Sequence, residues 1–235
     1  MMTENKNSFW LSVTDLMSGL MVVFMFIAIA YMYEMKQVVN AVIYITEGFQ
    51  DTEHSLYQEL NKEFKNDLEE WNAYIDSKSL SIIFKEPDVL FEKGEYSIKG
   101  RFKIILNDFF PRYIQVLNSE EFRSKILSIR IEGHTSSEWR KDTGERKSYL
   151  NNMSLSQLRA SEVLQYVLRT RLNGSYKWIR DRLVAVGYSS SKIKLTADKI
   201  EDKQLSRRVE FKVVTNAQEQ LYDLVALVSK DQKND

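Results

Sequence analysis

An acidic side chain lies inside the most apolar stretch of this chain. Asp15 is the only ionisable residue between Phe9 and Tyr33, a run of 25 residues rich in Met, Val, Phe, Ile and Leu. A run of that length is typical of a helix that crosses a lipid bilayer, and we assign a transmembrane helix to residues 9–35. At about 1.5 Å per residue, Asp15 lies roughly 9 Å along this helix from Phe9, which is inside the hydrocarbon.

A carboxylate at this depth is unfavourable, and it therefore indicates a function. A lone acid near the middle of a membrane helix costs roughly 2.5–3.5 kcal/mol on insertion, and such residues commonly mark ion or proton pathways. Ser12, Ser18 and Gly19 lie three or four positions from Asp15, on the same helical face, where small residues let another helix approach closely. The pattern predicts an ion-conducting acid at a helix–helix contact. The alternative is that Asp15 has no function, and that it stays protonated in the membrane or extends its side chain to the membrane surface.

A cleaved secretory signal is another explanation of an apolar stretch near the N-terminus. Ala28, Ile29 and Ala30 have the small-residue pattern of a cleavage site. A signal peptide, however, has an apolar core of roughly 7–15 residues that follows a basic segment. Here the apolar part is longer, it contains Asp15, and Lys6 is the only basic residue before it. These features favour a helix that stays in the membrane.

Residues 36–78 predict a helical linker with a break near Gly48. Apolar residues recur there mostly at three- or four-residue spacing, as far as Trp71 and Ile75, with acids and amides between them. The segment has 4 basic and 9 acidic residues, a net charge of −5, whereas residues 79–235 have 28 basic and 21 acidic residues, a net charge of +7. That basic excess suits an anionic ligand, and it equally suits an ordinary solvated surface.

Residues 79–235 predict a domain in which strands and helices alternate. Strands are expected at 80–84, 126–133, 182–187 and 207–214, helices at 98–117, 154–172 and 217–228, and polar loops at 136–150 and 189–205. Pro87 is expected to stop the first strand, and Pro111 to kink the first helix or end its first section. One sheet with helices packed on it, an α+β fold, accounts for this order.

Few residues of this chain suit catalysis or metal binding. Cysteine is absent, which excludes disulfides and thiolate metal sites. His54 and His134 are the only histidines and show no metal-ligand spacing, and Ser154 and Ser156 have no recognisable partner base. We therefore expect no enzymatic activity, no cofactor, no metal site and no direct contact with nucleic acid.

Three motifs in the second half of the chain resemble the OmpA-like peptidoglycan-binding domain. They are Glu132-Gly-His-Thr135 after a strand, Asn152-x-x-Leu155-Ser156-x-x-Arg159-Ala160 at the beginning of a helix, and Arg207-Arg208-Val-Glu-Phe211 in the last strand. The resemblance covers roughly residues 80–214. It implies a βαβαβ sandwich at residues 79–235 that binds the diaminopimelate stem of peptidoglycan, a diacid that carries an amine.

The resemblance carries over Asn152, Leu155, Arg159 and Arg208 as peptidoglycan-binding residues. Arg159 can hold a carboxylate through two hydrogen bonds, and Asn152 is expected at a helix start, where backbone N–H groups favour anions. The alternative is that Asn152 and Arg159 only stabilise the fold and that Arg208 only fixes loops. The family usually has an Asp after Gly-His-Thr that holds the amine of the ligand. This chain has Ser136 there, and Glu138 or Asp142 could take the role of that Asp.

A membrane helix with an early Asp before an OmpA-like domain is similar to the MotB-type B subunits of ion-driven rotary stators. The segment DLMSGLMVVF from Asp15 to Phe24 most resembles the ZorB family of Zorya anti-phage defence systems. This resemblance implies a homodimer within a ring of five ZorA- or MotA-like subunits, with protons passing by way of Asp15. It also implies a bacterial inner-membrane protein with residues 1–8 in the cytoplasm and the C-terminal domain in the periplasm. A flagellar stator subunit and a passive membrane-to-wall tether are the alternatives.

Overall fold

The structure is a computed structural model of the 235-residue chain, and it describes residues 4–85, 90–92, 94–140, 143–170 and 174–216. Two compact units divide the chain near residue 50. The expected stop at Pro87 and the expected helix at 217–228 lie outside the described residues.

The chain begins with one long helix, α1, at Glu4–Phe64. Its stretch Val13–Asn40, 28 residues, is long and apolar enough to cross a membrane, and none of that stretch is buried. The helix continues through Gly48, so the predicted break is wrong. A single glycine costs a helix only about 1 kcal/mol relative to alanine, which does not by itself end the helix.

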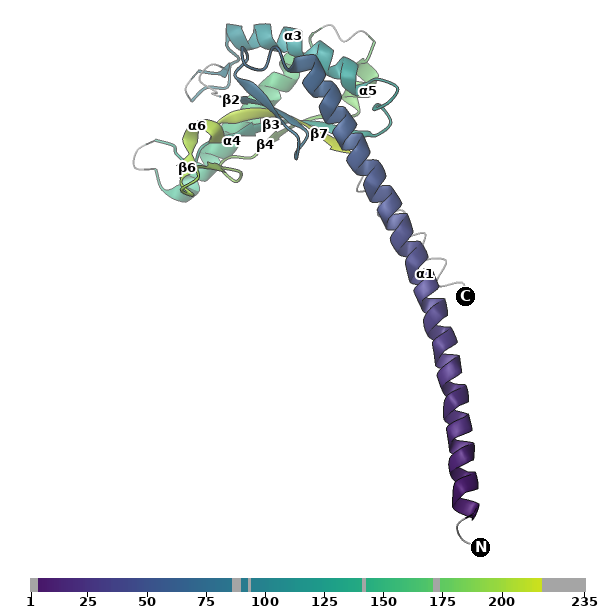
Figure 1. Cartoon of the computed structure of the whole chain (residues 1–235). Helices are drawn as coiled ribbons and strands as arrows, with labels where there is room; N and C mark the ends of the chain where they lie inside the picture. The colour runs from purple at the N-terminus through teal and green to yellow at the C-terminus, as the bar shows by residue number, and fades with distance from the viewer. Residues whose placement is uncertain (1–3, 86–89, 93, 141–142, 171–173, 217–235) are drawn as a thin grey trace. The chain divides into compact units, whose positions relative to one another are not determined.

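The second unit is built on a five-stranded sheet of order β1-β2-β7-β3-β4 (Figure 1). The strands are β1 at Ala73–Asp76, β2 at Ser81–Lys85, β3 at Ile126–His134, β4 at Leu183–Gly187 and β7 at Arg208–Thr215. β3 and β4 are parallel and the other neighbouring pairs are antiparallel. β5 at Lys194–Leu195 and β6 at Glu201–Asp202 form a separate small ribbon. The four strands predicted from the sequence are confirmed, and β1 lies in a segment that was predicted as helix.

Two long helices accompany the sheet. They are α3 at Gly100–Leu117 and α4 at Glu145–Val167, and the short helices are α5 at Tyr176–Arg180 and α6 at Lys203–Ser206. Pro111 lies inside α3 without ending it. α4 begins at Glu145, nine residues before the predicted start, so the polar loop that precedes it is shorter than expected.

Aromatic rings fill the core between α3 and the sheet. Phe84 of β2, Phe109 of α3 and Phe211 of β7 are fully buried, with ring centroids 4.9 to 5.8 Å apart. Along each strand, residues that point toward the helices alternate with residues that point to the opposite face of the sheet. The helices therefore cover one face, and a different set of side chains occupies the other.

The last turns of α1 belong to the same core. Leu56, Leu60 and Phe64 follow one another at four-residue spacing, which places them on one helical face, and all three are buried. The ring of Phe64 lies 5.2 Å from that of Phe109. The folded unit therefore begins near residue 50, before residue 79, where the sequence pattern placed its start.

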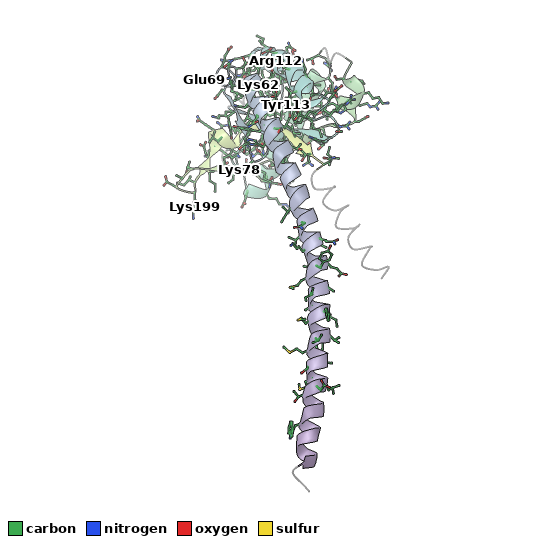
Figure 2. All side chains as sticks on the ribbon, turned by 45° about the vertical axis from the view of Figure 1, so that its right-hand side comes forward. Lys62, Glu69, Lys78, Arg112, Tyr113 and Lys199 are labelled. Atoms are coloured by element: carbon green, nitrogen blue, oxygen red, sulfur yellow. The ribbon has the colours of Figure 1, made fainter. Side chains whose placement is uncertain are left out.

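A single arginine joins the end of α1 to α3 (Figure 2). Arg112 donates from Nε to Glu63 Oε1 at 2.7 Å and from Nη2 to the Glu63 carbonyl at 2.9 Å. It also donates to Asp67 at 2.8 Å and to Asp108 at 2.9 Å, and its guanidinium lies 5.0 Å from the ring centroid of Phe64. Burial opposes the charge of Arg112, but the hydrogen bonds to Glu63 and Asp67 outweigh it and raise its pKa. One cation thus holds three acids and a helix-end carbonyl.

α4 lies directly on β3 and β4 because two glycines face it. A Cβ atom added at Gly133 would lie 2.3 Å from the backbone oxygen of Ser156, and one added at Gly187 would lie 2.5 Å from the backbone nitrogen of Gln157. Neither position has room for a side chain. This close packing fixes the part of α4 that carries the candidate binding residues.

Candidate functional site

Asp15 lies on the part of α1 that is able to cross a membrane, and its side chain is exposed in the single chain. Nearby hydroxyl groups bond to their own helix: Thr14 Oγ1 donates to the Trp10 carbonyl and Ser18 Oγ to the Thr14 carbonyl, each at 2.8 Å. Ser18 therefore needs no outside partner and can face another helix closely. The ion-conducting role of Asp15 stays a prediction.

Asn152 and Arg159 are seven residues apart on α4, two helical turns, and so lie on one face of the helix. Only 2% of Asn152 and 5% of Arg159 is exposed. The expectation that Asn152 lies at a helix start is wrong, because α4 begins at Glu145. The first turns of α4 expose Arg146 and Lys147, so they lack the apolar spacing by which a helix is predicted.

Asn152 joins α4 to the loop that follows β3. Its Nδ2 atom donates to the carbonyl of Ser136 at 3.1 Å and to the carbonyl of Glu138 at 3.2 Å. The amide therefore holds the backbone that follows the Gly-His-Thr motif. In this structure Asn152 uses its Nδ2 atom to support the loop, so that atom is not available to a ligand.

Arg159 is held by the connection between β2 and α3. Its Nε donates to the Glu95 carbonyl at 2.8 Å and its Nη2 to the Glu92 carbonyl at 3.4 Å. The guanidinium also lies 4.9 Å from the ring centroid of Phe91. Arg159 thus has a structural role, and its predicted contact with a ligand carboxylate remains a prediction.

Leu155 and Arg208 differ in their surroundings. Leu155 lies on α4 and is half-buried. Arg208 lies on β7, where it is buried, forms an ion pair with Glu210 and donates from Nη1 to the Ser206 carbonyl at 3.1 Å. These contacts give Arg208 the loop-fixing role that was its alternative interpretation. Contact of either residue with peptidoglycan stays a prediction.

Ser136, at the position where the resemblance led us to expect an Asp, is buried. Glu138, one of the two acids considered as a replacement, is largely exposed and forms an ion pair of 3.1 Å with Lys203. The other, Asp142, lies outside the described residues. Among the described residues, Glu138 is therefore the acid of that loop that an amine could reach, in competition with Lys203.

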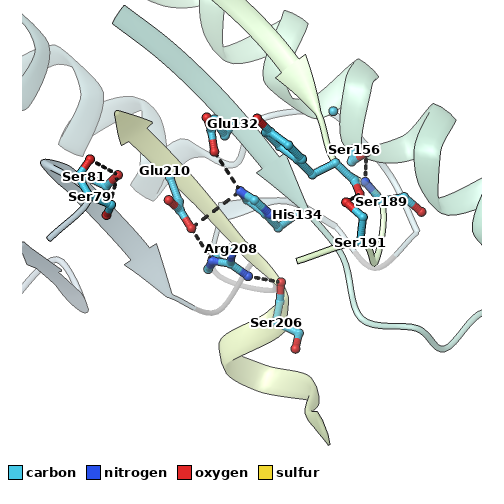
Figure 3. Close-up of polar contacts among 12 residues, drawn as sticks. Ser79, Ser81, Glu132, His134, Ser156, Ser189, Ser191, Ser206, Arg208 and Glu210 are labelled. Atoms are coloured by element: carbon cyan, nitrogen blue, oxygen red, sulfur yellow. Dashed lines mark hydrogen bonds and ion pairs between the residues drawn. The ribbon is translucent and has the colours of Figure 1, made fainter. Parts of the chain in front are cut away.

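A second polar group, which the sequence interpretation did not assemble, lies on β3 and β7 (Figure 3). Glu132 and His134 of β3 stand opposite Glu210 and Arg208 of β7. Burial lowers the pKa of His134, Arg208 lowers it further, and contact with Glu132 and the charge of Glu210 oppose that shift. Period-two alternation in both motifs could have placed these four residues on one face.

The two serines considered for catalysis both bond to backbone groups. Ser154 Oγ donates to the Leu150 carbonyl at 3.3 Å. Ser156 Oγ donates to the Met153 carbonyl at 3.0 Å and accepts from the Ser189 N–H at 3.0 Å. Both hydroxyl groups therefore have structural partners.

The chain was compared with proteins of known name. No family model matches it. The Zorya protein ZorB of Escherichia coli strain Crooks is 43% identical to it over 223 residues, which are 94% of this chain and 94% of that protein. The chain belongs to the ZorB family. A Zorya protein ZorB from a second Escherichia coli strain is 26% identical over 219 residues, 89% of this chain and 81% of that protein.

A solved structure agrees with the fold of this ZorB-family chain. The crystal structure of a MotB-like protein from Desulfovibrio vulgaris is 20% identical, with a TM-score of 0.51, and covers 72% of this chain and 98% of that one. Mixed helix and sheet after an apolar N-terminal helix is therefore confirmed as the fold class, and the folded unit has the fold of that MotB-like protein.

Proposed function

We propose that this ZorB-family chain is the B subunit of a proton-driven rotary membrane motor that is anchored to peptidoglycan and acts in anti-phage defence. Membership of the ZorB family supports the Zorya assignment. The MotB-like fold supports a stator-type subunit. The observation that carries the mechanism is Asp15, the only acid in the apolar run from Phe9 to Tyr33.

The surroundings of Asp15 support an assembly of several chains. The described side chains of α1 between Val13 and Asn40 are almost all exposed, so this stretch has no packing partner among the described residues. Ser18 and Gly19 lie on the Asp15 face, and a second helix can pack there closely. We propose a homodimer inside a pentameric ring of ZorA-like subunits, in which Asp15 exchanges protons at the helix contact.

The folded unit from residue 50 onward would hold this dimer to the cell wall. Its carboxylate-binding residue is proposed to be Arg159, next to Asn152 and Leu155. Contacts of Arg159 with the carbonyls of Glu92 and Glu95 preset the direction of the guanidinium. The proposed location is the bacterial inner membrane, with the wall-binding unit in the periplasm.

Replacement of Asp15 by Asn tests the motor. Asn retains size and hydrogen bonding but cannot take up and release a proton. One charge that crosses ~100 mV releases about 2.3 kcal/mol, and without it the motor has no drive. We expect Asp15→Asn to assemble and bind the cell wall normally and to lose protection against phage completely. Asp15→Glu should retain a small part of it.

The control is Glu34→Gln, which removes the other acid of the Val13–Asn40 stretch near its far end. This variant should protect like the wild type. If Asp15→Asn also protects fully at normal expression, the chain does not conduct ions through Asp15 and acts as a passive tether.

A further inference from the structure

Three buried side chains on β3 and β7 converge on one point, on the sheet face opposite α3 and α4. Glu132 and Glu210 stand directly opposite each other, and His134 lies two residues along β3 on the same face. Only 4% of Glu132, 3% of His134 and 6% of Glu210 is exposed. Two acids and an imidazole have thus been removed from water together.

Two of these three side chains, Glu132 and His134, have buried polar atoms without a hydrogen bond to any described residue. Glu132 Oε1 and both ring nitrogens of His134 are buried without a hydrogen-bond partner among the described residues. Buried polar groups in native proteins are nearly always paired, and those without a partner need an explanation such as a bound ion. The ring of Tyr188 stacks parallel on His134, with centroids 5.0 Å apart, and shields it from solvent.

The spacing of the three groups fits a small metal ion. His134 Nε2 lies 3.4 Å from Glu132 Oε2 and 3.6 Å from Glu210 Oε1, and the three ligand atoms all lie within 4.8 Å of one another. Around a tetrahedral zinc ion with ligand bonds of roughly 2.0–2.2 Å, neighbouring ligand atoms are about 3.4 Å apart. The two contacts of the imidazole therefore need little change to surround such an ion.

We propose that Glu132, His134 and Glu210 form a binding site for a divalent metal ion of the zinc class. Imidazole nitrogen and carboxylate oxygen are ligands that Zn²⁺ accepts, and a water molecule would complete four-fold coordination.

Arg208 supports this arrangement. Its Nε donates to Glu210 Oε1, and its Nη1 donates to the Ser206 carbonyl. Ligating carboxylates are commonly held by such an outer hydrogen bond, which fixes their orientation. The strand register places further titratable groups on this face: Arg130 of β3, Lys212 of β7, Lys85 of β2, and Tyr74 and Asp76 of β1. Burial raises the pKa of Tyr74, Arg208 lowers it, and Glu210 and Asp76 raise it.

The ion would join β3 to β7 next to the candidate wall-binding loop. The residue after His134, Thr135, donates its N–H to the Ser189 carbonyl, and the carbonyl of Ser136 accepts from Asn152. A metal at this point would hold the beginning of the loop in place. The metal would have a structural role, because the described residues around it bury all three ligand side chains.

The competing explanation is a proton alone. Two carboxylates and Arg208 have a net charge of −1, which one proton on His134 would cancel. The two explanations differ in whether the purified protein takes up metal. The two histidines of the chain make this measurable, because His54 is exposed on α1 and can be changed as a matched control.

The experiment uses the full chain, purified in detergent and stripped with a chelator. Zn²⁺ is titrated by calorimetry, and bound zinc is counted by mass spectrometry after gel filtration. We expect one zinc ion per chain for the wild type and for His54→Gln, and at least tenfold weaker binding for His134→Gln. Added zinc should raise the melting temperature of the first two proteins and not of the third.

X-ray absorption of the zinc-loaded wild type gives a second test that needs no variant. One imidazole with oxygen donors is expected in the spectrum. Absence of zinc uptake by the wild type, unchanged uptake by folded His134→Gln, or a spectrum without imidazole would overturn the proposal and leave the proton-only network.

Discussion

Arg159 is buried, so its replacement should affect the stability of the fold as well as binding to the cell wall. The side chain donates to the carbonyls of Glu95 and Glu92, and a hydrogen bond from a charged group contributes roughly 1.5–3 kcal/mol. Arg159→Ala is therefore expected to lower the free energy of unfolding by about that amount and to weaken sedimentation with purified sacculi. Arg146→Ala, an exposed change on the same helix, should alter neither.

Urea denaturation and sacculus pull-down measure these two effects separately. If Arg159→Ala unfolds at the same urea concentration as the wild type, the backbone contacts do not contribute to stability. If it also binds sacculi normally, the residue has no role at the wall.

The sequence motifs identified Asn152, Arg159 and Arg208, but not their burial. Arg159 is held by the carbonyls of Glu92 and Glu95, 67 and 64 residues away in the sequence, and no local pattern reports such a contact. The group around His134 was missed for a different reason. Its members alternate along two strands, and only the register between β3 and β7 brings them together.

At the scale of elements, two kinds of pattern predicted strands: residues 126–133 alternate, whereas residues 80–84 form a short apolar run. β1 was missed because Leu68, Trp71 and Ile75 continue the three- and four-residue spacing of the helix before them. The chain nevertheless turns at Asn72, whose φ of 50° is a left-handed conformation that asparagine tolerates. β1 then exists through its pairing with β2, a contact that helical spacing cannot reveal.

The contacts of Arg112 between α1 and α3 give a prediction at the scale of elements. Arg112 forms ion pairs with Glu63, Asp67 and Asp108. Arg112→Ala should reduce the free energy of unfolding by about 1–3 kcal/mol, since it leaves three acids close together without a partner. Hydrogen exchange at the end of α1 should quicken.

Lys62→Ala is the matched control for Arg112→Ala. Lys62 forms an exposed ion pair with Glu59, three residues away on α1. Such surface pairs contribute roughly 0–1 kcal/mol, so this change should have little effect. Equal effects of the two substitutions would show that the Arg112 contacts are no more than a surface ion pair.

At the scale of the whole molecule, our prediction of the orientation in the membrane rests on the proposed peptidoglycan ligand and not on charge. Lys6 and Lys36 flank the apolar stretch about equally, so the positive-inside rule decides little. We expect the N-terminus in the cytoplasm and the C-terminus in the periplasm. Alkaline phosphatase fused after Asp235 should be active, and green fluorescent protein at the same position should be dark. The reverse pattern would contradict peptidoglycan anchoring.

The burial of Leu56, Leu60 and Phe64 has a consequence for how such chains can be recombined. A hybrid of two relatives joined after residue 78 would combine the helix end of one protein with a core shaped for the other. Each large residue that no longer fills its space costs roughly 2–5 kcal/mol. A hybrid joined near residue 50 keeps the whole core from one parent. Functional exchanges between relatives should therefore have their crossover inside the long helix, not at its end.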